Sequence, residues 1–241
     1  MARALIGKLL VQSDGRVARL VEVEAYMGMD DPGSHAFRGP TPRAAIMFGP
    51  PGRLYVYFSY GVHWCANVVC GPEGSASAVL LRAAQPLRGI PAMRQARWHG
   101  QREPAERDLC RGPGRLCEAF GITGPDNGLN LTAPGGRLWL GDDGAGPGGK
   151  VVATLRVGLS RGAASPWRFL VEGSPWASRG PGEAGAGAVA KAPGPAPASG
   201  KATMRPGASK PPPAAEGRVA EGPKPPAAQG GKAATARPVR H

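Results

Sequence analysis

The stretch VEVEAYMGMDDPGSH, residues 21–35, carries the pattern from which the fold is predicted. It opens with two valines and an alanine that alternate with Glu22, Glu24 and Tyr26, the period-two pattern of a strand with one buried and one exposed face. One strand therefore points two carboxylates and a tyrosine to the same side. A turn-rich segment then leads to His35, one of four histidines in the chain. The face that carries these side chains is either solvated surface or the wall of a site.

The composition divides the 241 residues into a domain and a tail. Residues 181–241 contain no aromatic residue, no Leu and no Ile, and consist mostly of Ala, Pro, Gly, Lys and Arg. Such a segment buries too little apolar surface to offset the entropy of ordering it, so it is predicted to be a disordered, partly polyproline-II tail. All five Trp, four Tyr and five Phe fall within residues 1–180, which are predicted to form one globular domain.

The formal net charge of +13 favours an anionic partner. The tail carries nine basic and three acidic residues, and 19 of the 21 positive residues in the domain are Arg. Arginine suits bidentate phosphate contacts, although a GC-rich genome would produce the same bias. Nucleic-acid binding and general solubility both remain open. For the tail, electrostatic tethering to DNA and a neutral extension without a role are the two alternatives.

Few features point to metal, membrane or secretion. The four cysteines have the spacings C-x4-C and C-x6-C, which fit neither a zinc finger nor a redox C-x-x-C motif. There is no metal-ligand cluster, so no metal or cofactor is expected. No signal-peptide pattern or membrane-length apolar run is present, and we expect a cytoplasmic protein with reduced thiols. The opening MARALIGKLLVQ places Leu5, Ile6, Leu9 and Leu10 on one helical face, as if a longer native N-terminus preceded it or the start were misassigned.

The order of predicted elements is mixed rather than alternating. Strands are expected at residues 19–26, 53–71 as a pair broken at Gly61, 75–86, 137–143, 151–159 and 167–176, with helices near 89–97 and 108–122. This order predicts a single α+β domain around a curved, mostly antiparallel sheet with flanking helices.

Three of the four tyrosines fall within LYVYFSYGVHW, residues 54–64. Tyr55 and Tyr57 share one strand face, whereas Tyr60 breaks the alternation just before Gly61, where a ring would protrude. Ordinary strand propensity and core packing would explain these rings. On a basic domain, a protruding aromatic beside stacking aromatics also suits a wedge that enters a duplex and holds an extruded base.

The two stretches together suggest a pocket for a planar ring. Glu24 would be a general base that positions water, and Asn67 and His35 would add polar groups. Burial would penalise the ionised carboxylate unless an arginine stood close, and Arg82 in VLLRA is the candidate. The alternative for Glu24 is a surface carboxylate on a half-exposed strand. Glu22 receives no role and is either a surface carboxylate or a structural pair.

Ordered motifs from Ala2 to Ser178 resemble the alkyladenine, or 3-methyladenine, DNA glycosylase family with the mammalian-type fold. The matching strings are VEVEAY, DDPGSHAF, TPR, MFGPPGRLYVYFSYG, HWCANVV, VLLRA, GPGRLC, RVG and RFLVEGSPW. The resemblance implies that Glu24 activates the hydrolytic water. It also implies that Arg82 and the backbone carbonyl of Val157 help to hold that water.

The same resemblance implies a base pocket and a wedge. Tyr26 and His35 would line the pocket, Tyr57 would stack on the opposite face of the flipped base, and Asn67 would crowd the exocyclic amino group of guanine. Tyr60 would fill the gap that the base leaves in the duplex.

Four neighbouring positions are expected to contact DNA: Arg43, Val62, His63 and Leu80. The chain departs from the family's pattern at Ala44, where several bacterial relatives have Asn, and at Val62, where Met is common.

The resemblance implies a monofunctional N-glycosylase that removes alkylated purines from double-stranded DNA in base excision repair, with deaminated purines as a second candidate substrate. It would act as a monomer on the bacterial nucleoid. A strand-cleaving enzyme would need an amine nucleophile, and the domain offers only Lys8 and Lys150, neither in a motif. The alternatives are a non-catalytic protein that binds damaged DNA, and an RNA- or chromosome-associated protein whose tail is the working part.

Overall fold

The computed structural model describes residues 1–100 and 102–180. The predicted tail, residues 181–241, lies outside the described residues. The helical segments are α1 (Ala2–Leu5), η1 (Gly28–Asp30), η2 (Ala45–Phe48), α2 (Ile90–Ala96), η3 (Glu106–Asp108), α3 (Pro113–Ala119) and η4 (Gly124–Asp126). The strands are β1 (Leu9–Gln12), β2 (Val17–Met27), β3 (Leu54–Ser59), β4 (His63–Cys70), β5 (Ser77–Arg88), β6 (Leu138–Gly141), β7 (Val151–Thr154) and β8 (Arg168–Val171).

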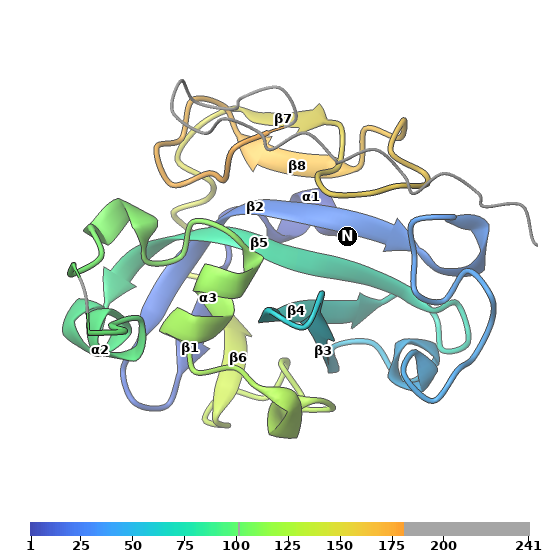
Figure 1. Ribbon diagram of the computed structural model, residues 1–241, viewed down its shortest axis with the longest axis horizontal. Coiled ribbons are helices and arrows are strands. Elements are labelled where there is room, and N and C mark those ends of the chain that lie inside the picture. Colours follow the sequence, from blue (N-terminus) through green and yellow to red (C-terminus); the bar gives the residue numbers. More distant parts are fainter. Residues whose placement is uncertain (101, 181–241) are drawn as a thin grey trace, which may run out of the picture. The chain divides into compact units, whose positions relative to one another are not determined.

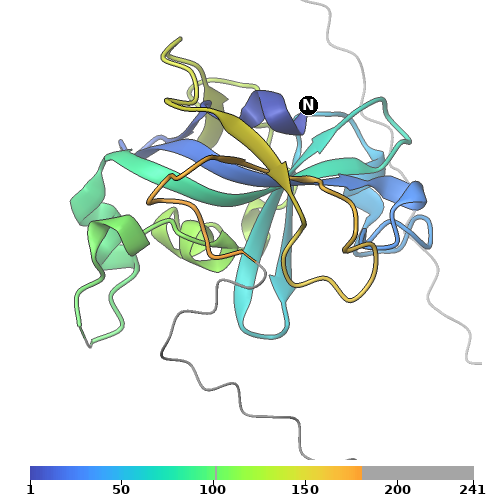
Figure 2. The same cartoon turned by 90° about the horizontal axis from the view of Figure 1, so that it is seen from above.

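The strands form one curved antiparallel sheet in the order β3-β4-β5-β2-β1-β6 (Figure 1). Beyond the point where β1 leaves β2, β8 takes its place as the neighbour of β2, and β7 pairs with β8. Figure 2 shows the β3–β4 hairpin running across the direction of β2 and β5. The prediction of an α+β domain around a curved, mostly antiparallel sheet is confirmed.

The long pairing between β2 and β5 is interrupted where the sheet has to bend. The register shifts between Leu20 and Glu22 and again between Glu22 and Val23. Such bulges bend a strand and increase its local twist. The irregularity falls at the Glu22 position, between the segment of β2 that pairs with β1 and the segment that pairs with β8.

Helix α3 covers one part of the sheet. It contacts β4 and β5 and buries Leu116 and Cys117, with Phe120 buried just after its end. All four cysteines are buried and free, as expected for reduced thiols. In the part of the chain that the structure describes, no helix is long and apolar enough to span a membrane.

Two local predictions are wrong. The first is the single helical face predicted for Leu5, Ile6, Leu9 and Leu10. Helix α1 ends at Leu5, because Gly7 has a φ of +90° and lies against the backbone of Gly146 and Pro147. Leu9 and Leu10 belong to strand β1 instead. Strand β2 has no exposed face around its glutamates, since Glu22 and Glu24 are both 0% exposed.

Glu22 is buried because it is the centre of an ionic network. Its carboxylate accepts hydrogen bonds from Arg82 Nε at 2.8 Å and Arg168 Nε at 2.7 Å. Ser178 adds its backbone N–H and its hydroxyl group. Burial alone would raise the pKa of Glu22, but the two guanidinium groups and the Ser178 hydrogen bonds bring it below the ordinary value. Glu22 is therefore a structural pair that joins β2, β5, β8 and the segment after β8.

Replacing Glu22 by Ala is expected to destabilise the domain strongly. The change leaves the buried guanidinium groups of Arg82 and Arg168 without their carboxylate, and breaking a buried pair in this way costs about 3–5 kcal/mol. Urea unfolding of the variant measures the loss. Glu172→Ala is the control, because Glu172 pairs with Lys150 at the surface and its side chain is 56% exposed. Equal midpoints for the two variants would contradict the structural role of Glu22.

Candidate active site

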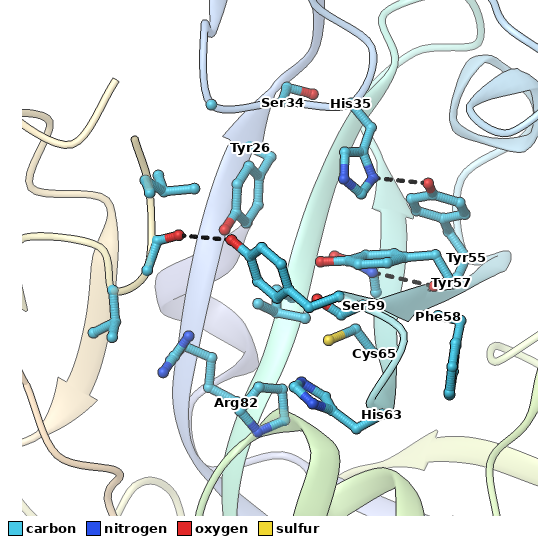
Figure 3. Close-up of a pocket in the computed structure, with 18 of the residues that line it drawn as sticks. Tyr26, Ser34, His35, Tyr55, Tyr57, Phe58, Ser59, His63, Cys65 and Arg82 are labelled. Atoms are coloured by element: carbon cyan, nitrogen blue, oxygen red, sulfur yellow. Dashed lines mark hydrogen bonds between the residues drawn. The ribbon is translucent and has the colours of Figure 1, made fainter. Parts of the chain in front are cut away.

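A cavity of about 330 Å³ opens beside β3, β4, β5 and β2. Figure 3 shows the side chains of Tyr26, His35, Tyr57 and Arg82 converging on this space from different elements. The residues that line it include Tyr26, Ser34, His35, Arg43, Met47, Tyr55, Tyr57, Phe58, Tyr60, His63, Cys65, Asn67, Leu80, Arg82, Pro113, Val157, Gly158 and Leu159.

One cross-strand row places the central groups. Tyr55 on β3 pairs with Asn67 on β4, Asn67 pairs with Leu80 on β5, and Leu80 pairs with Glu24 on β2. Directly paired residues in an antiparallel sheet point to the same face. The row therefore brings residues that are far apart in sequence to one wall. A neighbouring pair, Tyr57 and Cys65, continues the same face by the two-residue period.

Both carboxylate oxygens of Glu24 are held by groups that line the cavity. Oε1 accepts a hydrogen bond from the backbone N–H of Val157 at 2.8 Å and lies 3.4 Å from Arg82 Nη1. Oε2 accepts one from the Tyr26 hydroxyl at 3.0 Å. Glu24 is fully buried and lies just behind these lining residues, so the surface-carboxylate interpretation is wrong.

Arg82 is oriented by the same network. Its Nε binds Glu22 and its Nη2 donates to the Ser178 hydroxyl at 3.2 Å, which leaves Nη1 toward Glu24. Burial alone would lower the pKa of Arg82, but the Glu24 and Glu22 carboxylates raise it above its ordinary value. The predicted arginine neighbour of Glu24 is therefore present as a fixed cation.

A second buried ion pair shapes the loop that follows β2. Asp31 and Arg156 are joined by two contacts of 2.5 and 2.8 Å, and both side chains are 0% exposed. The Arg156 guanidinium also lies 4.8 Å from the Tyr26 ring centroid and 4.9 Å from that of Trp167. This pair supports the Tyr26 ring from behind and fixes the loop that returns His35 to the cavity.

His35 meets two tyrosines of β3. Its Nδ1 lies 2.9 Å from the Tyr55 hydroxyl, and its ring meets the edge of Tyr57 with a centroid separation of 4.5 Å. Burial, with a smaller contribution from Arg43, lowers the pKa of His35 to about 4. The imidazole is therefore neutral near pH 7. Burial also raises the pKa of Tyr57, so this wall of the cavity carries no negative charge.

The turn between β3 and β4 exposes the aromatic ring predicted to protrude. Tyr60 has a φ of +49° and is 86% exposed, and Gly61 and Val62 complete the turn. The Tyr60 hydroxyl donates to the carbonyl of Gly158 at 3.3 Å across the mouth of the cavity. A left-handed conformation is costly for a bulky residue and is often retained at functional sites.

The turn end of this hairpin packs on the start of α3. A Cβ atom at Gly114 would lie 2.7 Å from the His63 ring, so only glycine allows this close approach. His63 lines the cavity, whereas Val62 is 74% exposed at the turn.

The structure brings most of the predicted site residues to one cavity. Ten of them line it: Tyr26, His35, Arg43, Tyr57, Tyr60, His63, Asn67, Leu80, Arg82 and Val157. Glu24 lies directly behind the lining and Val62 lies outside it. Val157 reaches Glu24 through its N–H group, whereas the resemblance implied a role for its carbonyl.

Several lining residues were not predicted as site residues. Tyr55 had a signal, because it shares the strand face of Tyr57. Cys65 had one as well, as the direct cross-strand neighbour of Tyr57. Pro113 and Gly158 lie in the matching strings GPGRLC and RVG, whereas Leu159 follows them without a signal of its own.

The model of the Methylpurine-DNA glycosylase (MPG) family matches residues 1–175. Curated relatives each carry the name "Putative 3-methyladenine DNA glycosylase". The relative from Burkholderia lata is 48% identical over 178 residues, which is 74% of this chain and 84% of the relative. The relative from Nitrobacter winogradskyi is 50% identical over 179 residues, which is 74% of this chain and 81% of the relative. The relative from Anaeromyxobacter dehalogenans is 51% identical over 193 residues, which is 77% of this chain and 83% of the relative. The chain therefore belongs to the methylpurine-DNA glycosylase family.

Proposed function

We propose that this DNA glycosylase flips alkylated purines out of double-stranded DNA and hydrolyses their N-glycosidic bond, with Glu24 as general base. The observation that carries the proposal is the fully buried Glu24, whose oxygens contact Arg82, Val157 and Tyr26 at the wall of an aromatic cavity. Deaminated purines such as hypoxanthine are included, because they are planar rings of the same size.

Glu24 has capacity for one more hydrogen bond in this arrangement. A carboxylate offers about four lone-pair sites, and Val157, Tyr26 and Arg82 account for three contacts, so one acceptor site remains for a water molecule. Breaking the N-glycosidic bond develops positive charge on the sugar. Glu24 stabilises that charge and takes a proton from the attacking water, while Arg82 and the N–H of Val157 keep the carboxylate in place.

The aromatic walls suit a base that leaves easily. An alkylated purine is cationic or electron-poor, and a cation is attracted to the faces of tyrosine rings. Tyr26 and Tyr57 would hold the base between them, and the neutral His35 would not repel it. Asn67 donates its amide to the Tyr55 carbonyl at 3.2 Å, so it is fixed where it would crowd the amino group of guanine.

Tyr60 is the wedge of this mechanism. Its exposure and strained backbone suit a ring that enters the duplex and occupies the space of the flipped base. Arg43 and His63 at the rim, and Val62 beside the wedge, would contact the surrounding DNA. Leu80 is 3% exposed and lines the cavity, so its contact would be with the extruded nucleotide.

The positions of the two lysines of the domain support hydrolysis without strand cleavage. Lys8 pairs with Asp142 and Lys150 with Glu172, and neither lines the cavity. We therefore propose a monofunctional reaction, and we propose with it, as the resemblance implies, that the chain acts as a monomer on nucleoid DNA in base excision repair.

Replacing Glu24 by Gln is expected to lower base release at least about 100-fold, because the amide cannot accept the proton of water. Binding to lesion-bearing DNA should stay within a few-fold of native, since the amide retains the shape of the side chain. Single-turnover base release is measured from duplexes with one 1,N6-ethenoadenine, hypoxanthine or undamaged adenine.

Glu172→Gln is the matched control, because it removes a carboxylate from an exposed pair far from the reaction. It should release bases at the native rate. Near-native release by Glu24→Gln would contradict the assigned base. Tight lesion binding by the native chain without any release would indicate a damage-binding protein instead.

His35 provides a test by pH. Its pKa is depressed in the folded state, so its contribution to stability is present above the ordinary value of 6.5 and is lost as pH falls toward about 4. NMR titration of the imidazole, assigned with His35→Gln, is expected to show a midpoint near pH 4. A midpoint near 6.5 would show a solvated histidine and contradict the neutral pocket wall.

A further inference from the structure

A second cavity of about 440 Å³ has a composition unlike the first. In the described part of the chain it is lined by Arg107, Asp108, Arg111, Arg115 and Arg179, four guanidinium groups and a single carboxylate. None of these residues has a role in the proposed reaction.

Asp108 lies close to three of these arginines but can satisfy only a few of their N–H donors. It lies 3.1 Å from Arg115 Nη1 and 3.9 Å from both Arg111 Nη1 and Arg107 Nε. Each guanidinium has five N–H donors, so one shared carboxylate leaves most of them for another acceptor. The side chains of Arg107 and Arg115 are 67% and 48% exposed, which leaves those donors accessible.

The cluster is linked through the backbone to residues around the base cavity. The backbone of Arg111 bridges to Ala83, the residue after Arg82, and Arg111 Nε donates to the carbonyl of Ala177 at 2.7 Å. Arg179 follows Ser178, whose hydroxyl accepts a hydrogen bond from Arg82. Two residues after Arg111, Pro113 lines the base cavity itself. The cluster is therefore held beside the Glu22–Arg82 network on the α3 side.

The chemistry of the cluster favours phosphodiester groups. Arginine binds phosphate oxygens through two parallel N–H bonds, and a fixed group of arginines loses little entropy on binding. An acidic peptide would match the charge as well. However, a nucleotide that occupies the base cavity brings its own chain of phosphates to the neighbouring surface. This favours DNA over an acidic peptide as the partner of the cluster.

We propose that Arg107, Arg111, Arg115 and Arg179 form a second DNA contact that holds the phosphodiester backbone beside the flipped nucleotide. The proposal rests on the proposed function, because only a base in the first cavity brings the backbone here. It assigns the cluster to DNA grip and leaves bond cleavage to Glu24.

The test uses the full chain with Arg107→Gln and Arg115→Gln combined. These side chains are exposed, whereas Arg111 is retained because it also binds Ala177. Affinity for undamaged and lesion-bearing duplexes is measured between about 50 and 200 mM salt. The negative slope of log affinity against log salt is expected to become shallower by about 1 to 2, because each lost phosphate contact contributes about 0.9 to its magnitude. The single-turnover rate of base release at saturating enzyme should remain native.

Lys8→Gln combined with Lys150→Gln is the charge-matched control, and the tail is the same in every variant. An unchanged slope in the arginine variant, or an equal fall in the control, would overturn the proposal. Failure of the native chain to release any base would count against the proposed function. The salt slope on lesion-bearing duplex comes from binding alone, so it is measured independently of that outcome.

Discussion

The buried network around Glu22 is the constraint on which the rest of the structure depends. Glu22 and Glu24 stand two residues apart on one strand, and both are fully buried. Two carboxylates buried so close together need cations beside them. Arg82 contacts both, and Arg168 binds Glu22 from β8. The network therefore closes the sheet around β2 and orients Arg82 toward Glu24 at the same time.

The pairing of the strands places the side chains of the candidate site beside this network. Antiparallel pairing lines up Tyr55, Asn67, Leu80 and Glu24 across four strands, so the aromatic wall and the carboxylate share one face. The loop anchored by Asp31 brings His35 back to the same face. The strands hold the proposed reacting groups, while the strained turn at Tyr60 presents the proposed wedge at the cavity mouth.

Period-two alternation was enough to predict the strand of Glu24, the shared face of Tyr55 and Tyr57, and the turn at Tyr60. It could not predict that the glutamate face is buried, because the arginine that covers Glu22 from β8 lies 146 residues later in the chain. Val157 was reached only through family resemblance, since a backbone group leaves no signal in side-chain patterns. The arginine cluster escaped prediction because its members are scattered over distant segments.

Coupling between Glu22 and Arg82 is the most direct test of the network. Glu22 is proposed to act on base release by orienting Arg82. Single-turnover rates of Glu22→Gln, Arg82→Gln and the double variant, compared for chains shown to be folded by circular dichroism, form a double-mutant cycle. The double variant is expected to be no slower than Arg82→Gln alone. Losses that add in full would show that the two residues act independently and would contradict this expectation.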